Sequence, residues 1–326
     1  MSSVRLPMSF DSNSIPAKLI QLALGANPAP DFFAPYTYSE VEPLARHHRL
    51  LSLAAQCFPE NPQAIADQRQ IALRDLQIKA LTSSLKSQLT QAGIPHWEFK
   101  GAALGERLGE KVSRESRDID ILIPPQYFHD AYSIVVQGRT VQGPGYPEIG
   151  PANDKWRAVK DVRILNNQPN IKIELHWRIT AKYLHLDINE LVWEDISQSG
   201  DITDSLLSWI LCVHAAEHGF YRIRWARDLA ILEKQGKNPF SVSKQLPKTN
   251  AVSLVEQAMQ KFKDPSISLS NAQPSKWVEK VLSGSTSPPT WIEDHKMRFE
   301  MCPTLSSKLH LLVCLANGKL FPITKI

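Results

Sequence analysis

Residues 114–123 read RESRDIDILI, and the fold expected for the chain is built around this segment. Apolar side chains alternate with Asp118 and Asp120, which is the two-residue period of a half-buried β-strand. The two carboxylates therefore lie on one face of the strand, while the isoleucines between and after them point into a core. The two prolines that follow end the strand.

Two carboxylates this close repel each other unless a cation lies between them, and oxygen ligands suit Mg²⁺ or Mn²⁺. A second alternating stretch, residues 170–177, places Glu174 on one face together with Lys172 and His176. If the two strands are neighbours, Glu174 completes a carboxylate triad that can hold two metal ions, which orient a triphosphate and lower the barrier for in-line attack at its α-phosphate. The competing interpretation of the two aspartates is a capping or surface-charge role.

A third motif, Lys100-Gly101-Ala102, comes at the end of a short predicted strand and begins a helix. Backbone N–H groups and the positive end of the helix dipole can bind a phosphate at such a turn, with Lys100 as a point charge. The composition of the turn is weak on its own. Its position shortly before Asp118 strengthens the interpretation.

The residues around these motifs predict a small α/β core. The patterns indicate a helix over 126–138, a Gly/Pro-rich loop over 139–155, and two antiparallel strands around an Asn-rich turn, over 156–166 and 170–179.

Helical spacing of apolar residues dominates both ends of the chain. It predicts N-terminal helices over 14–25, 39–58 and 62–93, and it returns after about residue 185, most clearly over 205–220. The expected fold class is therefore α+β, with an N-terminal helical region (1–93), a core with a small mixed β-sheet (94–183) and a C-terminal helical region (184–326).

Composition favours an ordinary globular protein, since the 326 residues are 43% hydrophobic and carry a net charge of +4. Lys and Arg are scattered, so nucleic acid is not indicated as a partner. No secretory signal and no apolar run long enough to span a membrane is visible, so a cytoplasmic location and no membrane partner are expected. The four cysteines occur singly and are expected to be buried apolar residues.

In order, these motifs resemble the DNA polymerase β-like nucleotidyltransferase superfamily, in particular its bacterial "nucleotidyltransferase family" proteins. The matching segments are FKGAAL (99–104), RESRDIDILI (114–123), IELHW (173–177), and HAAEHGF and RIRWARDLA within 214–230. The resemblance covers roughly residues 85–235. It implies a nucleotidyltransferase core, an NTP substrate, metal ligation by Asp118, Asp120 and Glu174, and a phosphate-binding turn at Gly101.

Two departures from that pattern concern the triphosphate. Many members have Gly-Ser where this chain has Gly101-Ala102, and Ser where it has Arg117 before the first aspartate. The missing hydroxyl removes one triphosphate contact, for which Lys100 or Arg117 is predicted to compensate. The candidate nucleotide-binding residues are Lys100, Gly101, Ala102, Arg117, Lys172, His176 and Arg224.

Further along, His214 and His218 are spaced one helical turn apart, without the H-E-x-x-H order of a zinc protease. Helix packing is favoured over zinc binding for this pair. The arginines within 222–228 contact triphosphate or an acidic acceptor, or form ion pairs with Asp228 and Glu217; the ion pairs are favoured, and both interpretations stay open.

The predicted function is metal-dependent transfer of NMP from an NTP to a hydroxyl or phosphate of an acceptor. A small molecule, peptide or protein is favoured over RNA as this acceptor. One alternative is a catalytically weak or inactive protein that keeps the fold and regulates or binds. Another is a toxin-like modifier of tRNA or protein.

Overall fold

The computed structural model describes most of the chain. The described residues are 11–110, 113–143, 150–151, 160–180, 188–237, 250–264 and 278–286, with Lys296, Phe299, Lys308, Leu309 and Leu311. Several predicted segments extend beyond them, namely parts of the 139–155 loop, the start of the 156–166 strand and most of the chain after 264.

The longer N-terminal helices begin with side-chain caps. The helices are α1 (Ile15–Ala23), α2 (Tyr38–His47), α3 (Leu51–Ala54) with a 3₁₀ turn (Ala55–Cys57), and α4 (Pro62–Gln91). At α2, the Thr37 backbone N–H donates to Glu40 at 2.8 Å, and at α4 the Asn61 side chain accepts from two backbone N–H groups. These caps satisfy donors that have no partner inside a helix.

The single helix predicted over 39–58 was wrong, because the chain breaks between α2 and α3. Arg49 has a φ of 55°, in the left-handed region, which no helix continues through. At the break, His48 Nδ1 lies 3.4 Å from the backbone nitrogen of Ile223, which donates to it. A tertiary contact therefore accompanies a turn that the apolar spacing does not reveal.

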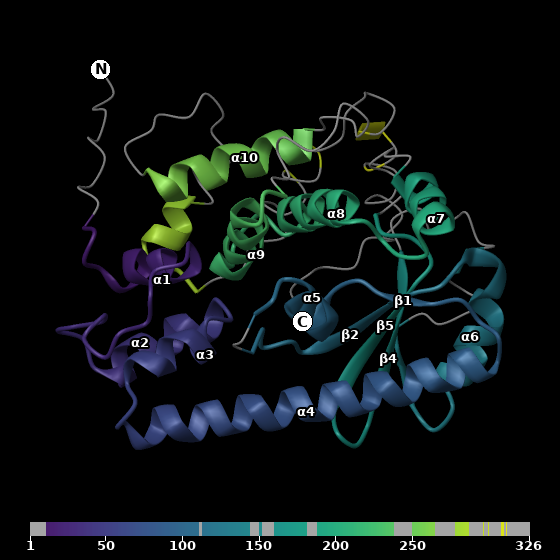
Figure 1. The fold of residues 1–326 in the computed structure, drawn as a ribbon, viewed down its shortest axis with the longest axis horizontal. Helices are drawn as coiled ribbons and strands as arrows, with labels where there is room; N and C mark the ends of the chain where they lie inside the picture. Colours follow the sequence, from purple (N-terminus) through teal and green to yellow (C-terminus); the bar gives the residue numbers. More distant parts are fainter. Residues whose placement is uncertain are drawn as a thin grey trace.

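The longest helix, α4, has 30 residues and is about 45 Å long, and it runs beneath the other elements in the view of Figure 1. Its second half buries Ile78, Leu85 and Leu89 in a core shared with the sheet. Leu73 and Leu76 on its other side are exposed. The helix thus joins the N-terminal helices to the sheet.

Five strands form one mixed sheet in the order β1-β2-β5-β4-β3. They are β1 (Trp97–Glu98), β2 (Asp118–Leu122), β3 (Thr140–Gln142), β4 (Asp161–Asn166) and β5 (Ile171–His176). β2 pairs with β5 in parallel, and the other pairs are antiparallel. The predicted α+β class with a small mixed sheet is confirmed, as is the antiparallel β4–β5 pair. Short β3, which lies in the stretch predicted as a loop, is a correction.

One face of the sheet is apolar. The isoleucines of β2, including Ile119 and Ile121, pack there against α4 and against α6 (Phe128–Val135), which follows a 3₁₀ turn (Pro125–Tyr127). The short helix α5 (Gly101–Arg107) lies between β1 and β2 in the chain. The polar residues of β2 and β5 are left for the opposite face.

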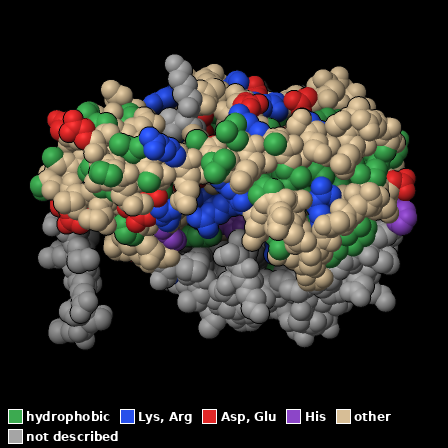
Figure 2. Space-filling model, turned by 90° about the horizontal axis from the view of Figure 1, so that it is seen from below, with side chains coloured by type: hydrophobic (Ala, Val, Ile, Leu, Met, Phe, Trp, Pro, Cys, Tyr) green, Lys and Arg blue, Asp and Glu red, His purple; other side chains and the backbone are tan. Residues whose placement is uncertain are grey.

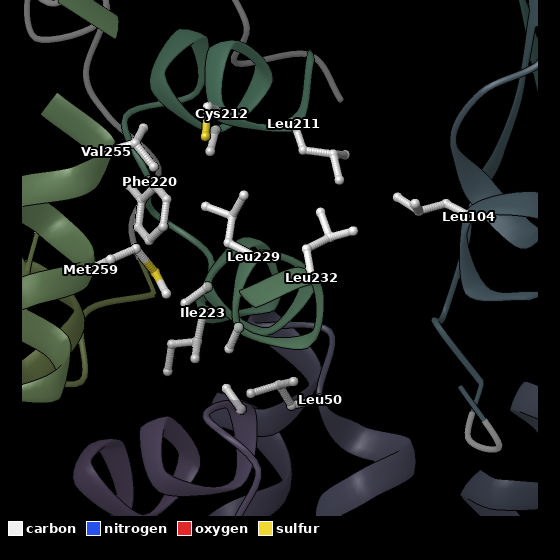
Figure 3. Packing of buried hydrophobic residues seen from close by; sticks show 14 of the residues in the cluster. Leu50, Leu104, Leu211, Cys212, Phe220, Ile223, Leu229, Leu232, Val255 and Met259 are labelled. Atoms are coloured by element: carbon white, nitrogen blue, oxygen red, sulfur yellow. The ribbon is translucent and has the colours of Figure 1, made fainter. Parts of the chain in front are cut away.

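The C-terminal helices are α7 (Ile188–Ser199), α8 (Asp204–Glu217), α9 (Ile223–Lys234) and α10 (Asn250–Lys263). Figure 3 shows Phe220, Ile223, Val255 and Met259 gathered where α8, α9 and α10 meet. Leu50, beside α3, belongs to the same core, so N-terminal and C-terminal helices share one apolar cluster. The division at 93/94 and 183/184 stays a prediction.

No helix within the described residues is long and apolar enough to cross a membrane.

Candidate active site

The carboxylates come together because β2 and β5 are parallel neighbours in a fixed register. Asp118 lies opposite Lys172, and Asp120 lies opposite Glu174. Residues opposite one another on paired strands share a face, so the side chains of Asp118, Asp120 and Glu174 lie on the same side of the sheet. The structure therefore places Glu174 beside the Asp-x-Asp strand, as the sequence predicts.

Asp120 is the centre of this group, and its side chain is buried. Its Oδ1 accepts from Lys100 Nζ at 2.9 Å and lies 3.0 Å from His176 Nε2. Lys100 is itself buried, and its Nζ lies 4.8 Å from the centre of the Phe99 ring. The lysine predicted to be a point charge for phosphate is an internal partner of a carboxylate here.

Glu174 and Asp118 share a second lysine. Lys172 Nζ is 2.8 Å from Glu174 Oε1 and 3.6 Å from Asp118 Oδ2. Arg163 of β4, which lies opposite Glu174, brings its Nε to 3.7 Å from the same Oε1. Each carboxylate of the group thus has a lysine amine within 4.0 Å.

The electrostatics separate the two aspartates. Burial raises the pKa of Asp118, and the negative charges of Asp120 and Glu174 raise it further. For Asp120 burial acts in the same direction, but the charge of Lys100 and the hydrogen bond from His176 outweigh it, so its pKa is lowered to about 2. The same kind of compensation, by His176 and Lys172, holds the pKa of Glu174 well below its usual value. Asp120 and Glu174 are therefore anionic at neutral pH.

One group of side chains in the described residues has the spacing of a metal site. Asp120, Glu174 and His176 each offer a ligand atom, and these atoms lie within 4.8 Å of one another. Two carboxylates and an imidazole are suitable donors for a divalent cation. The group differs from the predicted triad, since His176, predicted to bind nucleotide, takes the place of Asp118. His176 Nδ1 is buried without a hydrogen-bond partner in the described part of the chain.

The Lys100-Gly101 turn is required by the backbone. Gly101 has a φ of 65°, and a Cβ at this position would lie 3.4 Å from the backbone oxygen of Asp118. Glycine thus lets α5 begin close to β2 in a left-handed conformation. At the same turn, the backbone N–H of Ala103 donates to Glu98 Oε1 at 3.3 Å. A carboxylate of the chain therefore accepts from the N–H of Ala103, the residue directly after the Gly101 and Ala102 that are predicted to meet a phosphate.

The corner between α8 and α9 carries an aromatic cluster. His218 stacks on Trp225 with ring centres 5.4 Å apart, and His214 meets the same indole edge-on at 5.9 Å. Burial lowers the pKa of His214, and the positive charge of Lys100 adds to this effect. The packing role predicted for the two histidines agrees with these contacts. Glu217 pairs with Lys160 at 2.7 Å, not with the arginines of α9 as one interpretation held.

The arginines of α9 form a buried ion-pair cluster with residues near β2. Arg224 pairs with Glu110, and its Nε lies 3.3 Å from Asp228. Arg114, from the segment that leads into β2, also binds Asp228, with its Nε at 3.2 Å from Oδ1. Arg227 Nε is 2.7 Å from Glu110. This geometry favours the ion-pair interpretation of Arg224 over nucleotide binding, and Glu110 is a partner that the sequence analysis missed.

The family model described as "Uncharacterised nucleotidyltransferase" matches residues 38–260, from α2 to α10. The chain belongs to this family. No curated protein and no solved structure matches the chain.

Proposed function

We propose that this protein is a metal-dependent nucleotidyltransferase, which transfers NMP from an NTP to a hydroxyl or phosphate of an acceptor. The observation that carries the proposal is the register of β2 and β5, which brings the carboxylates of Asp118, Asp120 and Glu174 to one face. The family match over most of the chain supports the same reaction class.

In this proposal Asp118, Asp120 and Glu174, with His176 beside them, hold Mg²⁺ or Mn²⁺. Bound there, the cation would offset the charge that develops on the phosphate oxygens. The residues fit this role because two of the carboxylates are ionised and their ligand atoms already lie close to that of His176. Lys100 and Lys172 offset the mutual repulsion of these carboxylates.

The reaction forms a bond between an acceptor oxygen and the α-phosphorus of the NTP. The bond from that phosphorus to the bridging oxygen breaks, pyrophosphate leaves, and the proton of the acceptor hydroxyl passes to solvent. The helical flanks would recognise the acceptor, because the carboxylate face performs chemistry common to many substrates. The mild, scattered positive charge favours a small molecule, peptide or protein as acceptor over RNA.

The first test measures binding without knowledge of the acceptor. Each NTP with Mg²⁺ or Mn²⁺ is added to the wild type and to the double variant Asp118→Asn/Asp120→Asn, and thermal unfolding is followed. At a ligand concentration 100-fold above Kd, the expected stabilisation is about 2.7 kcal/mol. Asp130→Asn, an exposed change in the first turn of α6, is the matched control and should keep the shift.

A metal-dependent shift that the double variant loses, followed by transfer of label from α-labelled NTP, supports the enzyme. If the wild type is folded and none of the NTPs raises its unfolding temperature, the enzyme proposal is contradicted.

A second candidate is a protein that binds nucleotide without turnover. The contacts of Lys100 and Lys172 with the carboxylates favour it, since a metal ion has to displace or share these amines. The Ala102 methyl, where many members offer a hydroxyl, favours it too. Nucleotide binding that depends on Asp120, with no label transferred to any acceptor, would identify this case.

A further inference from the structure

Three arginines near Asp118 differ from the paired arginines of the ion-pair cluster. Arg49 follows α2, Arg117 directly precedes Asp118, and Arg222 is the residue directly before α9. Within the described part of the chain, none of the three lies within 4.0 Å of a carboxylate oxygen. The Nε atoms of Arg49 and Arg222 are buried, and no described residue accepts a hydrogen bond from them.

Two tertiary contacts bring these segments together. His48 Nδ1 accepts from the backbone N–H of Ile223 at 3.4 Å, which fixes Arg49 beside the segment that carries Arg222. Ser52 binds the loop that leads into β2, because its backbone N–H donates to Glu115 Oε1 at 2.7 Å.

The Ser52 hydroxyl also donates to the Ser113 carbonyl oxygen at 2.8 Å. Because Glu115 and Ser113 shortly precede Arg117, these two bonds from Ser52 hold Arg117 near the turn between α2 and α3. The three segments that carry the arginines therefore lie close together in the fold, although they are far apart in the sequence.

The electrostatics agree with this placement. Burial lowers the pKa of Arg222 to about 10, and the positive charge of Arg49 is the next largest cause. Burial also lowers the pKa of Arg49, and the negative charge of Asp118 opposes this lowering. Figure 2 shows one face of the molecule, on which Lys and Arg side chains gather near the middle with histidine beside them.

Buried guanidinium nitrogens that lack an acceptor, as the Nε atoms of Arg49 and Arg222 do among the described residues, are unfavourable near like charges unless an anion reaches them. The planar group of arginine is well suited to phosphate oxygens, which it can bind with two parallel hydrogen bonds. Asp118 ties this cationic site to the carboxylate face, so its ligand and the metal ligand would be neighbours. A polyphosphate chain has the charge and the length to contact both.

We propose that Arg49, Arg117 and Arg222 form the subsite that binds the pyrophosphate part of the NTP, the leaving group of the transfer. This assignment rests on the proposed function. It also moves triphosphate binding away from the Gly101 turn, where Glu98 occupies one of the backbone donors. The arginines would align the bond that breaks and stabilise the charge that collects on the leaving oxygens.

The test uses inorganic pyrophosphate and tripolyphosphate as probes, by isothermal titration with the full chain. The variants are Arg117→Gln, Arg222→Gln and Arg49→Gln, and the control is Arg69→Gln, an exposed arginine on α4. Each of these three subsite variants is expected to weaken tripolyphosphate binding by about tenfold to a hundredfold, because each loses a charge-assisted contact. The wild-type affinity should also fall as salt concentration rises, and Arg69→Gln should match the wild type.

Arg117 is exposed, so Arg117→Gln tests the subsite even if a variant at a buried position fails to fold. Arg222→Lys, which keeps the charge but loses the planar group, should recover only part of the affinity. Tripolyphosphate that binds all folded variants as tightly as the wild type overturns the assignment.

The two proposals fail separately. If NTP binds in a metal-dependent way but the arginine variants bind it unchanged, the subsite is wrong and the proposed function stands. If tripolyphosphate needs the arginines but no NTP binds with metal, the site is an anion site and the proposed function is wrong.

Discussion

Asp228→Ala tests whether the buried ion-pair cluster holds the fold together. The side chain of Asp228 is 1% exposed and contacts the guanidinium groups of Arg114 and Arg224. Three guanidinium groups share two carboxylates in the cluster, with Arg227 and Glu110 as the remaining members. The variant leaves three positive charges to one negative charge in a buried place.

The magnitude follows from what remains after the change. Arg114 keeps the carbonyl oxygen of Gly101 at 3.5 Å, a neutral and long contact. Arg224 keeps Glu110, which it shares with Arg227. Removing one partner of a buried ion pair costs about 3–5 kcal/mol, mostly because the other charge stays buried without compensation. We expect Asp228→Ala to lower the free energy of unfolding by that amount.

The control lies on the same helix. Glu233 pairs with Lys263 at 2.6 Å, but these side chains are 34% and 44% exposed. Such surface pairs contribute about 0–1 kcal/mol. Glu233→Ala should therefore lower the free energy of unfolding far less than Asp228→Ala does, although both variants remove one carboxylate from α9.

The assay is equilibrium unfolding in urea at neutral pH, since guanidinium salts would screen the charges under test. Asp228→Asn, measured alongside, keeps the shape and should show how much of the loss is due to charge. If Asp228→Ala and Glu233→Ala differ by less than about 1 kcal/mol, with both variants folded and two-state, the reasoning from burial is refuted.

Three further predictions concern buried groups elsewhere. Burial, helped by nearby positive charges, lowers the pKa of His48 to about 3, so the folded protein keeps it neutral while the unfolded chain protonates near pH 6.5. The contribution of neutral His48 to the free energy of unfolding is therefore present above about pH 6.5 and is lost as the pH falls below it. Between about pH 7.5 and 5.5, urea unfolding of the wild type should show a loss of about 1.4 kcal/mol, and His48→Gln should lack this loss. Burial raises the pKa of the Cys57 thiol to about 12 and also raises that of Cys212, so iodoacetamide should label neither in the native protein; mass spectrometry that finds either one modified before unfolding would contradict this. Leu85→Ala, at a fully buried position of α4, should cost about 2–5 kcal/mol, whereas Leu76→Ala at a position 65% exposed should stay within about 0.5 kcal/mol, and similar urea midpoints would show that this face is not buried.

The elements with a strong local signal were predictable. The alternation in RESRDIDILI and in IKIELH defines β2 and β5, and the shared face of Asp118, Asp120 and Glu174 follows from period and register. The limits of α4 follow from Asn61 at its start and Gly93 just beyond its end. In each case a local rule and the tertiary structure agree.

Other features depend on contacts between distant residues, which a single sequence does not contain. The break at Arg49 interrupts no apolar pattern. The backbone of Ile223, which donates to His48 at this break, is far away in the chain. The ion pair between Lys100 and Asp120 could not be predicted either, because the sequence alone equally allows Lys100 to bind a phosphate. Arg49 and Glu110 carried no sequence signal at all, because isolated charges are common on surfaces. Short β3 is an edge strand with few side chains to show a period.

The contact between His48 and Ile223 closes a loop of 175 residues. During synthesis, the turn at Arg49 has no partner until α9 has left the ribosome. Contacts of such separation slow folding, because the entropy of closing the loop is lost before the contact stabilises anything. The carboxylate strands, in contrast, are complete once β5 has emerged. We therefore expect a nascent chain to assemble its acidic face before Arg222 joins Arg49 and Arg117, so that a chain interrupted before α9 would leave the proposed pyrophosphate subsite incomplete.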